Sequence, residues 1–326
     1  MFQALLASLL LTGTVAAPTA PIAPAAPATA PMTEAEMLRL STDYWTRMTL
    51  PTLVNGKGPY AFTIDTAADR SVVSDVVANE LALPKAGAAT LYGIVGPTQV
   101  SLVTMDKFRI GRREKRRVDV PVLPREHLGA AGFIGVDALA NEIVLLDFKR
   151  SQISIARSPE EAMEKEDGVI VVTGKSKFGQ LVLTDARIGK TKIYAIIDTG
   201  AQTTIGNMAF RKLLTGRTQP IVDQDRYLIG VTGAHLPYEN GHVARMELGD
   251  LIVVDLNVAL ADVQTFRKFG IDDKPALLIG MDVLRGFERV AIDFRKRNVR
   301  FLIGKGLYKE ETRTAESKGT SGSLAL

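Results

Sequence analysis

The chain alternates apolar and polar residues in short runs that are broken by turn residues, and this pattern occurs twice. Asn55-Gly56-Lys57 and Ile188-Gly189-Lys190 each separate two apolar runs and are typical of hairpin turns. Each hairpin leads into a strand-like run that ends in an aspartate, Asp65 or Asp198, and 198 − 65 = 133 is also the offset between the two turns. The pattern predicts a mainly β chain built from two similar halves.

Three further landmarks follow each aspartate in the same order. The first is a helix start with a predicted N-cap residue, the second is a Gly-x-x-Gly hairpin tip, and the third is a Gly-x-Asp-x-Leu segment followed by two strands joined by a basic turn. The predicted N-caps are Ser74 and Asn207, and the hairpin tips are residues 92–96 and 229–233. The Gly-x-Asp-x-Leu segments lie within residues 133–139 and 278–284. Ordered landmarks shared by both halves indicate a duplication far more strongly than any single match does.

The pattern and the local composition divide the chain into six predicted segments. Glu34 is the first charged side chain, and an uncharged apolar leader is typical of a secretory signal peptide. The segments are a signal peptide at 1–16, a Pro/Ala-rich linker at 17–42, an N-terminal lobe at 43–157, an inter-lobe connection at 158–168, a C-terminal lobe at 169–308 and a disordered tail at 309–326. The leader predicts a periplasmic or secreted protein without an integral membrane domain.

Composition and charge exclude several other classes of function. The 326 residues suffice for two lobes, and the formal net charge is only +4. The basic clusters at 112–117 and 295–300 are interpreted as solvated hairpin turns, and the aromatic content of 6% gives nucleic-acid binding little support. The chain has no cysteine, and its three histidines lack metal-site spacing, so no metal site is expected.

The repeated aspartates are the candidate chemistry. Two carboxylates held close together cannot both ionise easily, so the pair keeps one proton over the working pH range. One member can then take a proton from a water that attacks a substrate carbonyl, while the other donates a proton. This chemistry needs no cofactor. Asp65 and Asp198 taken singly would be turn or N-cap residues, an alternative that the repeated context disfavours.

These residues resemble the retropepsin-like aspartic peptidases, here in a tandem single-chain form over about residues 45–305. The family motif is two apolar residues, Asp, Ser or Thr, Gly and Ala. "IIDTGA" (196–201) satisfies it fully, whereas "TIDTAA" (63–68) departs from it at Ala67. The resemblance implies two pseudo-twofold-related β-barrel lobes with short helices, an active cleft between them, and catalytic roles for Asp65 and Asp198.

The resemblance also implies roles for the residues nearby. Thr66 and Thr199 would join the two loops through their hydroxyl groups, and Ala67 and Gly200 would let the loops approach closely. The hairpin tips would be flaps over a peptide or protein substrate bound in extended form. The implied flap and substrate-binding residues are Tyr92, Gly93, Gly96, Gly230 and Gly233. One chain would hold the whole site, so the protein is expected to be a monomer.

Other interpretations stay open at this point. If the Ala67 methyl does not fit a positive φ or a close contact, the same fold would be a catalytically inactive peptide-binding module. Tyr92 is either a flap residue or a half-buried strand tyrosine. Asp137 and Asp282 are interpreted as helix caps. Asp69, which has Gln202 as its counterpart, is interpreted as a rim or lobe-contact charge.

Overall fold

The computed structural model describes residues 3–4, 11–13, 48–156, 163, 168–177, 179–216, 226–304, 309–310 and 322–325. The predicted signal peptide, linker and tail therefore lie largely outside the described residues. The strands placed within those three segments are β1 (Gln3–Ala4), β2 (Leu11–Gly13), β23 (Lys309–Glu310) and β24 (Gly322–Ala325). β1 pairs with β6 (Lys85–Tyr92), β2 pairs with β16 (Tyr227–Ile229), and β24 pairs with β19 (Leu251–Leu260).

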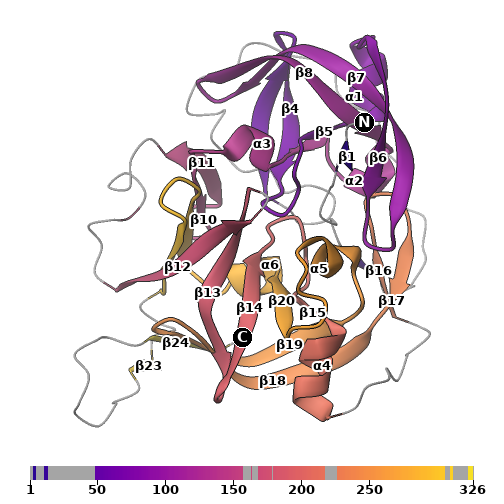
Figure 1. Ribbon diagram of the computed structural model, residues 1–326. Coiled ribbons are helices and arrows are strands. Elements are labelled where there is room, and N and C mark those ends of the chain that lie inside the picture. The colour runs from indigo at the N-terminus through magenta and orange to yellow at the C-terminus, as the bar shows by residue number, and fades with distance from the viewer. Residues whose placement is uncertain are drawn as a thin grey trace.

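Six strands of the first lobe close into a barrel, drawn in indigo to magenta in Figure 1. The hydrogen-bonded order is β7-β3-β4-β9-β5-β8, and β8 pairs back with β7. The strands are β3 (Thr49–Val54), β4 (Lys57–Ile64), β5 (Val72–Ser74), β7 (Pro97–Ile110), β8 (Arg113–Leu123) and β9 (Gly132–Ile134). A closed barrel leaves no strand edge unpaired, which is one solution to the edge problem of small β domains.

Six strands of the second lobe close in the same order. The ring runs β18-β13-β14-β20-β15-β19, and β19 pairs back with β18. The strands are β13 (Gln180–Ile188), β14 (Thr191–Ile197), β15 (Ile205–Gly206), β18 (Glu239–Leu248), β19 (Leu251–Leu260) and β20 (Ala276–Ile279). Each strand thus has a counterpart at the same place in the first ring, which confirms the predicted mainly β fold with two similar lobes.

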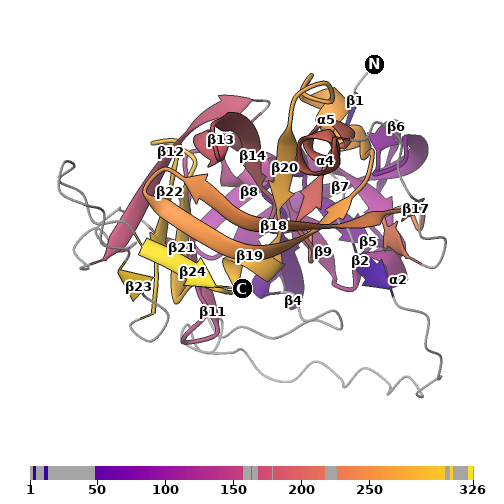
Figure 2. The same cartoon turned by 90° about the horizontal axis from the view of Figure 1, so that it is seen from below.

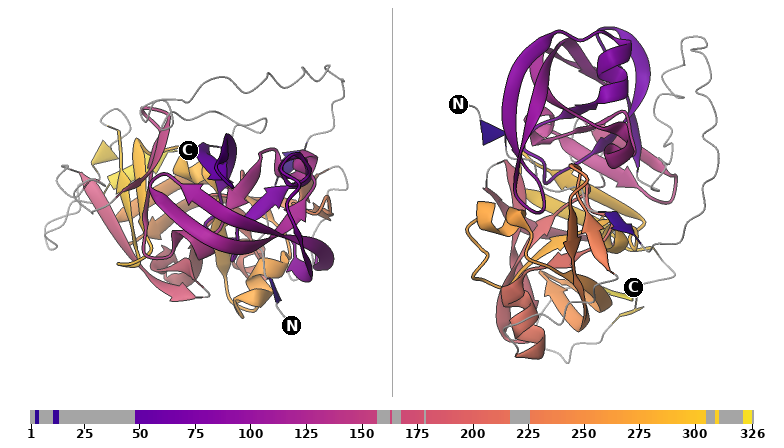
Figure 3. Two further views of the ribbon diagram at one scale, coloured as in Figure 1. Left: turned by 90° about the horizontal axis from the view of Figure 1, so that it is seen from above. Right: turned by 90° about the vertical axis from the view of Figure 1, so that its right-hand side faces the viewer.

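A run of five strands, called here the inter-lobe sheet, joins the two lobes and continues into the second barrel through the pairing of its last strand with β13. Its order is β11-β10-β21-β22-β12, so the closing hairpin of each lobe contributes two strands (Figures 1 and 2). These strands are β10 (Ile143–Asp147), β11 (Gln152–Ala156), β12 (Val169–Lys177), β21 (Arg289–Asp293) and β22 (Asn298–Leu302). The central pair is antiparallel, with Leu145 opposite Ala291. The right-hand view of Figure 3 shows the first lobe above the second.

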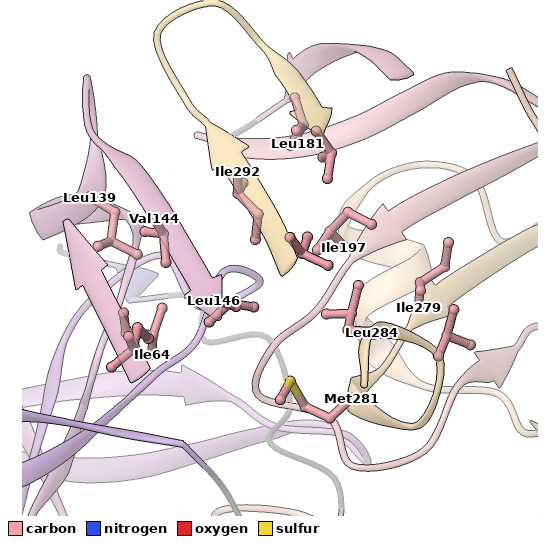
Figure 4. Close-up of a cluster of buried hydrophobic side chains, with 14 of the residues drawn as sticks. Ile64, Leu139, Val144, Leu146, Leu181, Ile197, Ile279, Met281, Leu284 and Ile292 are labelled. Carbon is pink, nitrogen blue, oxygen red and sulfur yellow. The ribbon is translucent and has the colours of Figure 1, made fainter. Parts of the chain in front are cut away.

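One hydrophobic core runs through both lobes. Buried side chains from the first lobe and from the second form a single cluster, part of which is shown in Figure 4. Its labelled members are Ile64, Leu139, Val144, Leu146, Leu181, Ile197, Ile279, Met281, Leu284 and Ile292. Because burial of apolar surface is the main favourable term in folding, this shared core fixes the lobes against each other.

Short helices follow the strands, as the landmarks predict. They are α1 (Asp75–Glu80), α2 (Arg125–Leu128), α3 (Val136–Leu139), α4 (Met208–Thr215), α5 (Gln264–Lys268) and α6 (Met281–Leu284). Both predicted N-caps are confirmed, since Ser74 accepts a hydrogen bond from the Val77 amide at 3.3 Å and Asn207 accepts one from the Phe210 amide at 2.8 Å. Among the described residues, no helix has both the length and the apolar character needed to cross a membrane.

The expectation of solvated hairpin turns is confirmed for the two basic clusters, except at Arg300. The turn in the first is at Gly111-Arg112, and the remaining basic residues lie on strand β8. In the second, Arg300 is only 4% exposed, and its guanidinium lies 3.7 Å from the buried carboxylate of Asp293. The interpretation of Arg300 as solvated is therefore wrong, because its strand lies inside the inter-lobe sheet and a buried charge there needs a partner.

Candidate active site

Each repeated aspartate directly follows a barrel strand, and both are fully buried. Asp65 follows β4, and its Oδ1 accepts the amides of Ala67 and Ala68, both at 2.9 Å. Asp198 follows β14, and its Oδ1 accepts the amides two and three residues on, at 3.0 and 3.1 Å. Two amide donors commit Oδ1 of each carboxyl as an acceptor, so Oδ2 is the oxygen that can carry or release a proton.

Two threonines tie the aspartate loops together across the lobes. The Thr66 hydroxyl donates to the Ile197 carbonyl at 2.7 Å and accepts the Thr199 amide at 3.1 Å. Reciprocally, the Thr199 hydroxyl donates to the Ile64 carbonyl at 2.8 Å and accepts the Thr66 amide at 3.2 Å. Four buried hydrogen bonds therefore hold one loop against the other, in the way that the resemblance implied for these threonines.

The two carboxyls lie close to each other. A Cβ placed on Gly200 would be 2.5 Å from Cγ of Asp65, while the Gly200 amide binds Asp198. Burial, and after it the negative charge of Asp65, raises the pKa of Asp198 well above the ordinary range of an aspartate. The geometry and the electrostatics both fit a pair that holds one shared proton.

Ala67 fits its position without strain. Positive φ values among the non-glycine residues occur at eight described positions, and Ala67 is not one of them. Its counterpart Gly200 has no positive φ either, so the need for glycine in the second loop comes from the contact with Asp65 and not from the backbone conformation. Ala67 is completely buried between the lobes. One reason for expecting a displaced first loop is therefore removed.

A second pair of aspartates binds the residues that follow the two aspartate loops. Asp137 accepts the amide and the hydroxyl of Ser71 at 2.8 and 2.9 Å, and Asp282 accepts those of Thr204 at 2.8 and 2.7 Å. The N-caps of α3 and α6 are instead Gly135 and Gly280. The interpretation of the two aspartates as caps of these helices is thus wrong, because their carboxylates brace the strand entries that follow the aspartate loops.

Asp69 joins the lobes, as its interpretation as a lobe-contact charge predicts. Its carboxylate forms an ion pair with the Lys268 ammonium at the end of α5 and accepts the Gln180 side-chain amide at 2.9 Å. The same amide also donates to the Ala67 carbonyl at 2.5 Å. Both partners come from the second lobe. Sequence reasoning missed them, since a single Gln and a single Lys carry no motif.

The predicted flaps are hairpins of unequal length. The first joins β6 (Lys85–Tyr92) to the 14-residue β7. The second joins two three-residue strands, β16 (Tyr227–Ile229) and β17 (His235–Pro237). The first tip closes through a hydrogen bond from the Gly93 amide to the Gly96 carbonyl at 2.9 Å, and the second through one from Gly233 to Gly230 at 2.8 Å. Tyr92 is the half-buried last residue of β6.

The two flap tips exchange side chains between the lobes. Ile94 is fully buried in a cluster of the second lobe that contains Ala201, and Val231 is fully buried in a cluster of the first lobe that contains Ala68. These positions correspond, since 231 − 94 = 137 is also the offset between Gly93 and Gly230. Because each cluster includes a residue three positions beyond Asp65 or Asp198, the tips lie next to the aspartate loops.

Neighbouring segments hold the tips in this closed arrangement. The Gln264 amide at the start of α5 donates to the Ile94 carbonyl at 2.9 Å. A Cβ on Gly233 would lie 2.6 Å from the His127 ring of α2, and one on Gly93 would lie 3.3 Å from the Thr232 hydroxyl of the other tip. Glycine is therefore required at Gly233 both by its φ of 76° and by this close contact. We call this arrangement, in which each tip is packed into the opposite lobe, the closed form.

The described residues contain no group of three or more His, Cys, Asp or Glu side chains that could hold a metal ion. The residues brought together at the site are the two aspartates, the two threonines, Ala67 and Gly200. The flap glycines lie at the tips, where they were predicted.

One comparison with known proteins finds a match within the first lobe. Residues 50–141 match the model of a family described as "gag-polyprotein putative aspartyl protease". The matched segment covers the first barrel from β3 to α3, and the second barrel repeats the same ring of strands. No curated protein sequence matches the chain at a significant level. The match and the two closed barrels together fit a tandem retropepsin-like fold.

Proposed function

We propose that the protein is an aspartic endopeptidase, in which Asp65 and Asp198 activate a water that hydrolyses peptide bonds. The observation that carries the proposal is the pair of buried aspartate loops, joined by four threonine hydrogen bonds, with matching amide donors on both carboxyls. A structural turn aspartate needs no such partner from another lobe.

The proposed reaction uses the asymmetry of a pair with one proton. The ionised carboxyl takes a proton from a water molecule, whose oxygen attacks the peptide carbonyl and forms a tetrahedral intermediate. The protonated carboxyl donates toward the developing oxyanion. Collapse of the intermediate then breaks the C–N bond, and the amine leaves with a proton from the pair.

The flaps would bind the substrate as an added strand. An extended peptide needs main-chain donors and acceptors beside it, which hairpin strands supply. Both carboxyls are fully buried in the closed form, so a peptide can reach them only after the surrounding side chains move. The flap tips that carry Ile94 and Val231 are the proposed moving parts. Closure over the bound peptide would then exclude bulk water from the reaction.

The test is cleavage of a peptide library by the purified protein from acidic to neutral pH, with and without a transition-state-mimicking inhibitor of aspartic peptidases. Asp65→Asn and Asp198→Asn should each abolish turnover and leave the circular dichroism spectrum unchanged, because each removes proton sharing. Asp185→Asn, an exposed aspartate on β13, is the matched control and should cleave like wild type.

A catalytically inactive peptide-binding module of the same fold is the second candidate. The departure from the motif at Ala67 favours it, whereas the unstrained backbone at Ala67 speaks against it. If wild type binds library peptides and cleaves none at any pH, the module replaces the enzyme. Full cleavage by a folded Asp198→Asn protein would reject the mechanism.

We further propose that the protein is exported and acts as a monomer. Export rests on the uncharged apolar leader, and the monomer rests on both aspartates being present in one chain. Cell fractionation with N-terminal sequencing tests the first, and a cytoplasmic protein that still begins at Met1 would contradict it. Analytical ultracentrifugation combined with the cleavage assay tests the second.

A further inference from the structure

The surroundings of the two aspartate loops differ in charge. Beside the first loop, Asp69 and Lys268 form an ion pair in which the ammonium side chain is 3% exposed and the carboxylate 21%. At the corresponding position of the second loop, Gln202 accepts a hydrogen bond from Arg285 at 3.3 Å. The buried cation therefore lies on the Asp65 side of the pseudo-twofold axis, and the counterpart of Asp69 on the Asp198 side is a neutral amide.

Lys268 belongs to a cross-lobe cluster that reaches the first loop. It ends α5, and its ammonium meets Asp69, four residues beyond Asp65 on the same loop. Gln180 binds both the Ala67 carbonyl and the Asp69 carboxylate, which fixes that loop from the second lobe. A buried lysine costs free energy unless it is paired, and Asp69 provides that pairing here.

Lys268 also interacts electrostatically with Asp65. Burial lowers the pKa of Lys268, while the negative charges of Asp69 and, more weakly, Asp65 act in the opposite direction. Interactions between charges are reciprocal, so the ammonium favours the ionised form of Asp65. The other charged groups near the cluster are Arg70, which faces Asp69, and Lys177, whose ammonium binds the Phe269 carbonyl.

We propose that Lys268 is a positioning residue that makes Asp65 the ionised, water-activating member of the pair and leaves the shared proton on Asp198. The inference rests on the proposed peptidase function and deepens it, because the symmetric hydrogen bonds of the two loops do not distinguish the base from the acid. The lone pairs of Asp198 Oδ1 are engaged by two amides, so its proton sits on Oδ2.

The pH profile of kcat/KM provides the first test. Lys268→Met removes the cation, so Asp65 should ionise at higher pH. The acid limb of the profile, where kcat/KM falls as the pH decreases, should then move up by about one pH unit. At pH values below this limb, the shift lowers kcat/KM about tenfold. Lys268→Arg should keep the wild-type limb. Arg267→Met is the matched control, because it removes an exposed charge from the preceding position of α5. Arg267 pairs with Asp262 and not with Asp69.

Lys268→Met leaves Asp69 without its cation and can fail to fold. The double variant Lys268→Met/Asp69→Asn removes both charges together and should show a smaller but measurable upward shift of the acid limb, because the negative charge of Asp69, which opposes ionisation of Asp65, is lost as well. An acid limb of either variant that coincides with that of Arg267→Met would overturn the proposal. The proposal would also be overturned if the acid limb of Lys268→Arg moved up as far as that of Lys268→Met.

A second measurement does not depend on turnover. At neutral pH, Asp65→Asn should raise the melting temperature more in the Lys268→Met background than in wild type or Arg267→Met, because an ionised Asp65 without its neighbouring cation is less stable. If Asp65→Asn raises the melting temperature equally in all three backgrounds, the proposal is overturned. If wild type cleaves no peptide, the peptidase function fails by itself, and the increments alone decide whether Lys268 acts on Asp65.

Discussion

In the first lobe the repeated aspartate is followed by Thr66, Ala67, Ala68 and Asp69. In the second lobe it is followed by Thr199, Gly200, Ala201 and Gln202. Each threonine hydroxyl makes two hydrogen bonds to the other loop, one as donor and one as acceptor, so the four bonds are related by the pseudo-twofold axis. The amides that bind each carboxyl lie two and three residues beyond it in both loops. The residues beyond them differ in size and charge. The loops therefore share one geometry, while the environment of each carboxyl is its own.

This comparison separates two requirements that the family motif combines. Glycine at the second loop is needed because the Asp65 carboxyl occupies the space where a Cβ would be. The first loop accepts Ala67, so the pair as a whole tolerates a methyl group on one side only. A two-lobe chain can make such a distinction, whereas a symmetric dimer must use one residue for both loops.

The exchange Gly200→Ala should produce the largest effect. Its new methyl would meet three atoms of the Asp65 carboxyl at 2.5 to 2.9 Å, so the carboxyl must move. Misplacement by about 1 Å can cost on the order of 100-fold in rate, and we expect at least that loss in kcat. The reverse change, Ala67→Gly, is the control and should keep most of the activity, with a loss of stability of about 0.5–1 kcal/mol. Equal losses of kcat in the two variants would contradict the comparison.

Removal of either threonine hydroxyl should be the next largest effect. Thr66→Ala leaves the buried Ile197 carbonyl and Thr199 amide without their partner, and Thr199→Ala does the same to Ile64 and Thr66. Each change should lower the free energy of unfolding by about 2 kcal/mol, measured by urea denaturation. Thr→Ser variants keep the hydroxyl and should lose less. Because the two threonines make equivalent bonds, the two alanine variants should lose similar free energies of unfolding. A loss in only one of them would show that the threonine hydrogen bonds are not symmetric.

The flap tips offer a smaller test of the same symmetry. Ile94→Ala removes more buried apolar surface than Val231→Ala, so it should loosen the closed form more. Hydrogen exchange of the Gln264 amide, which binds the Ile94 carbonyl, should accelerate on the order of tenfold or more in Ile94→Ala. Val95→Ala, at an exposed tip position, is the control. Unchanged exchange in Ile94→Ala would mean that the tip is not held by this side chain.

The stability of the protein should depend on pH through Asp198. Its folded pKa is raised, so the protonated form favours the folded state, and this contribution is lost as pH rises from the ordinary aspartate range of about 4 through the raised value. Asp198→Asn has no such loss. The melting temperature of wild type should therefore fall relative to that of Asp198→Asn as pH increases. A constant difference across the acidic to neutral range would contradict the raised pKa.

The parts of this fold that depend on neighbouring residues were predictable from the sequence. Turn residues, N-caps and alternation are local signals, and the hairpin at Asn55, the caps Ser74 and Asn207 and the Gly-x-x-Gly tips were all predicted correctly. The duplication added a check, because each landmark had a counterpart. The aspartate pair followed from the same repeat.

Contacts between the lobes could not be predicted in this way. The inter-lobe sheet, the exchange of Ile94 and Val231 and the pair of Asp69 with Lys268 join residues that are far apart in sequence and carry no spacing signal. Burial is equally non-local, which is why Arg300 was misjudged as solvated. The roles of Asp137 and Asp282 were missed because a helix-start aspartate also looks like a cap from sequence.

Titration of the two carboxyl carbons by NMR, in protein labelled with ¹³C at the aspartate carboxyls, tests most directly that the pair acts as one unit. Asp65→Asn and Asp198→Asn assign the two signals. The account predicts that Asp198 stays protonated well above the ordinary aspartate range, that the Asp65 signal shifts in the same step, and that Asp65→Asn lowers the pH at which Asp198 titrates. Two independent titrations in the ordinary range, with Asp198 unaffected by Asp65→Asn, would contradict it.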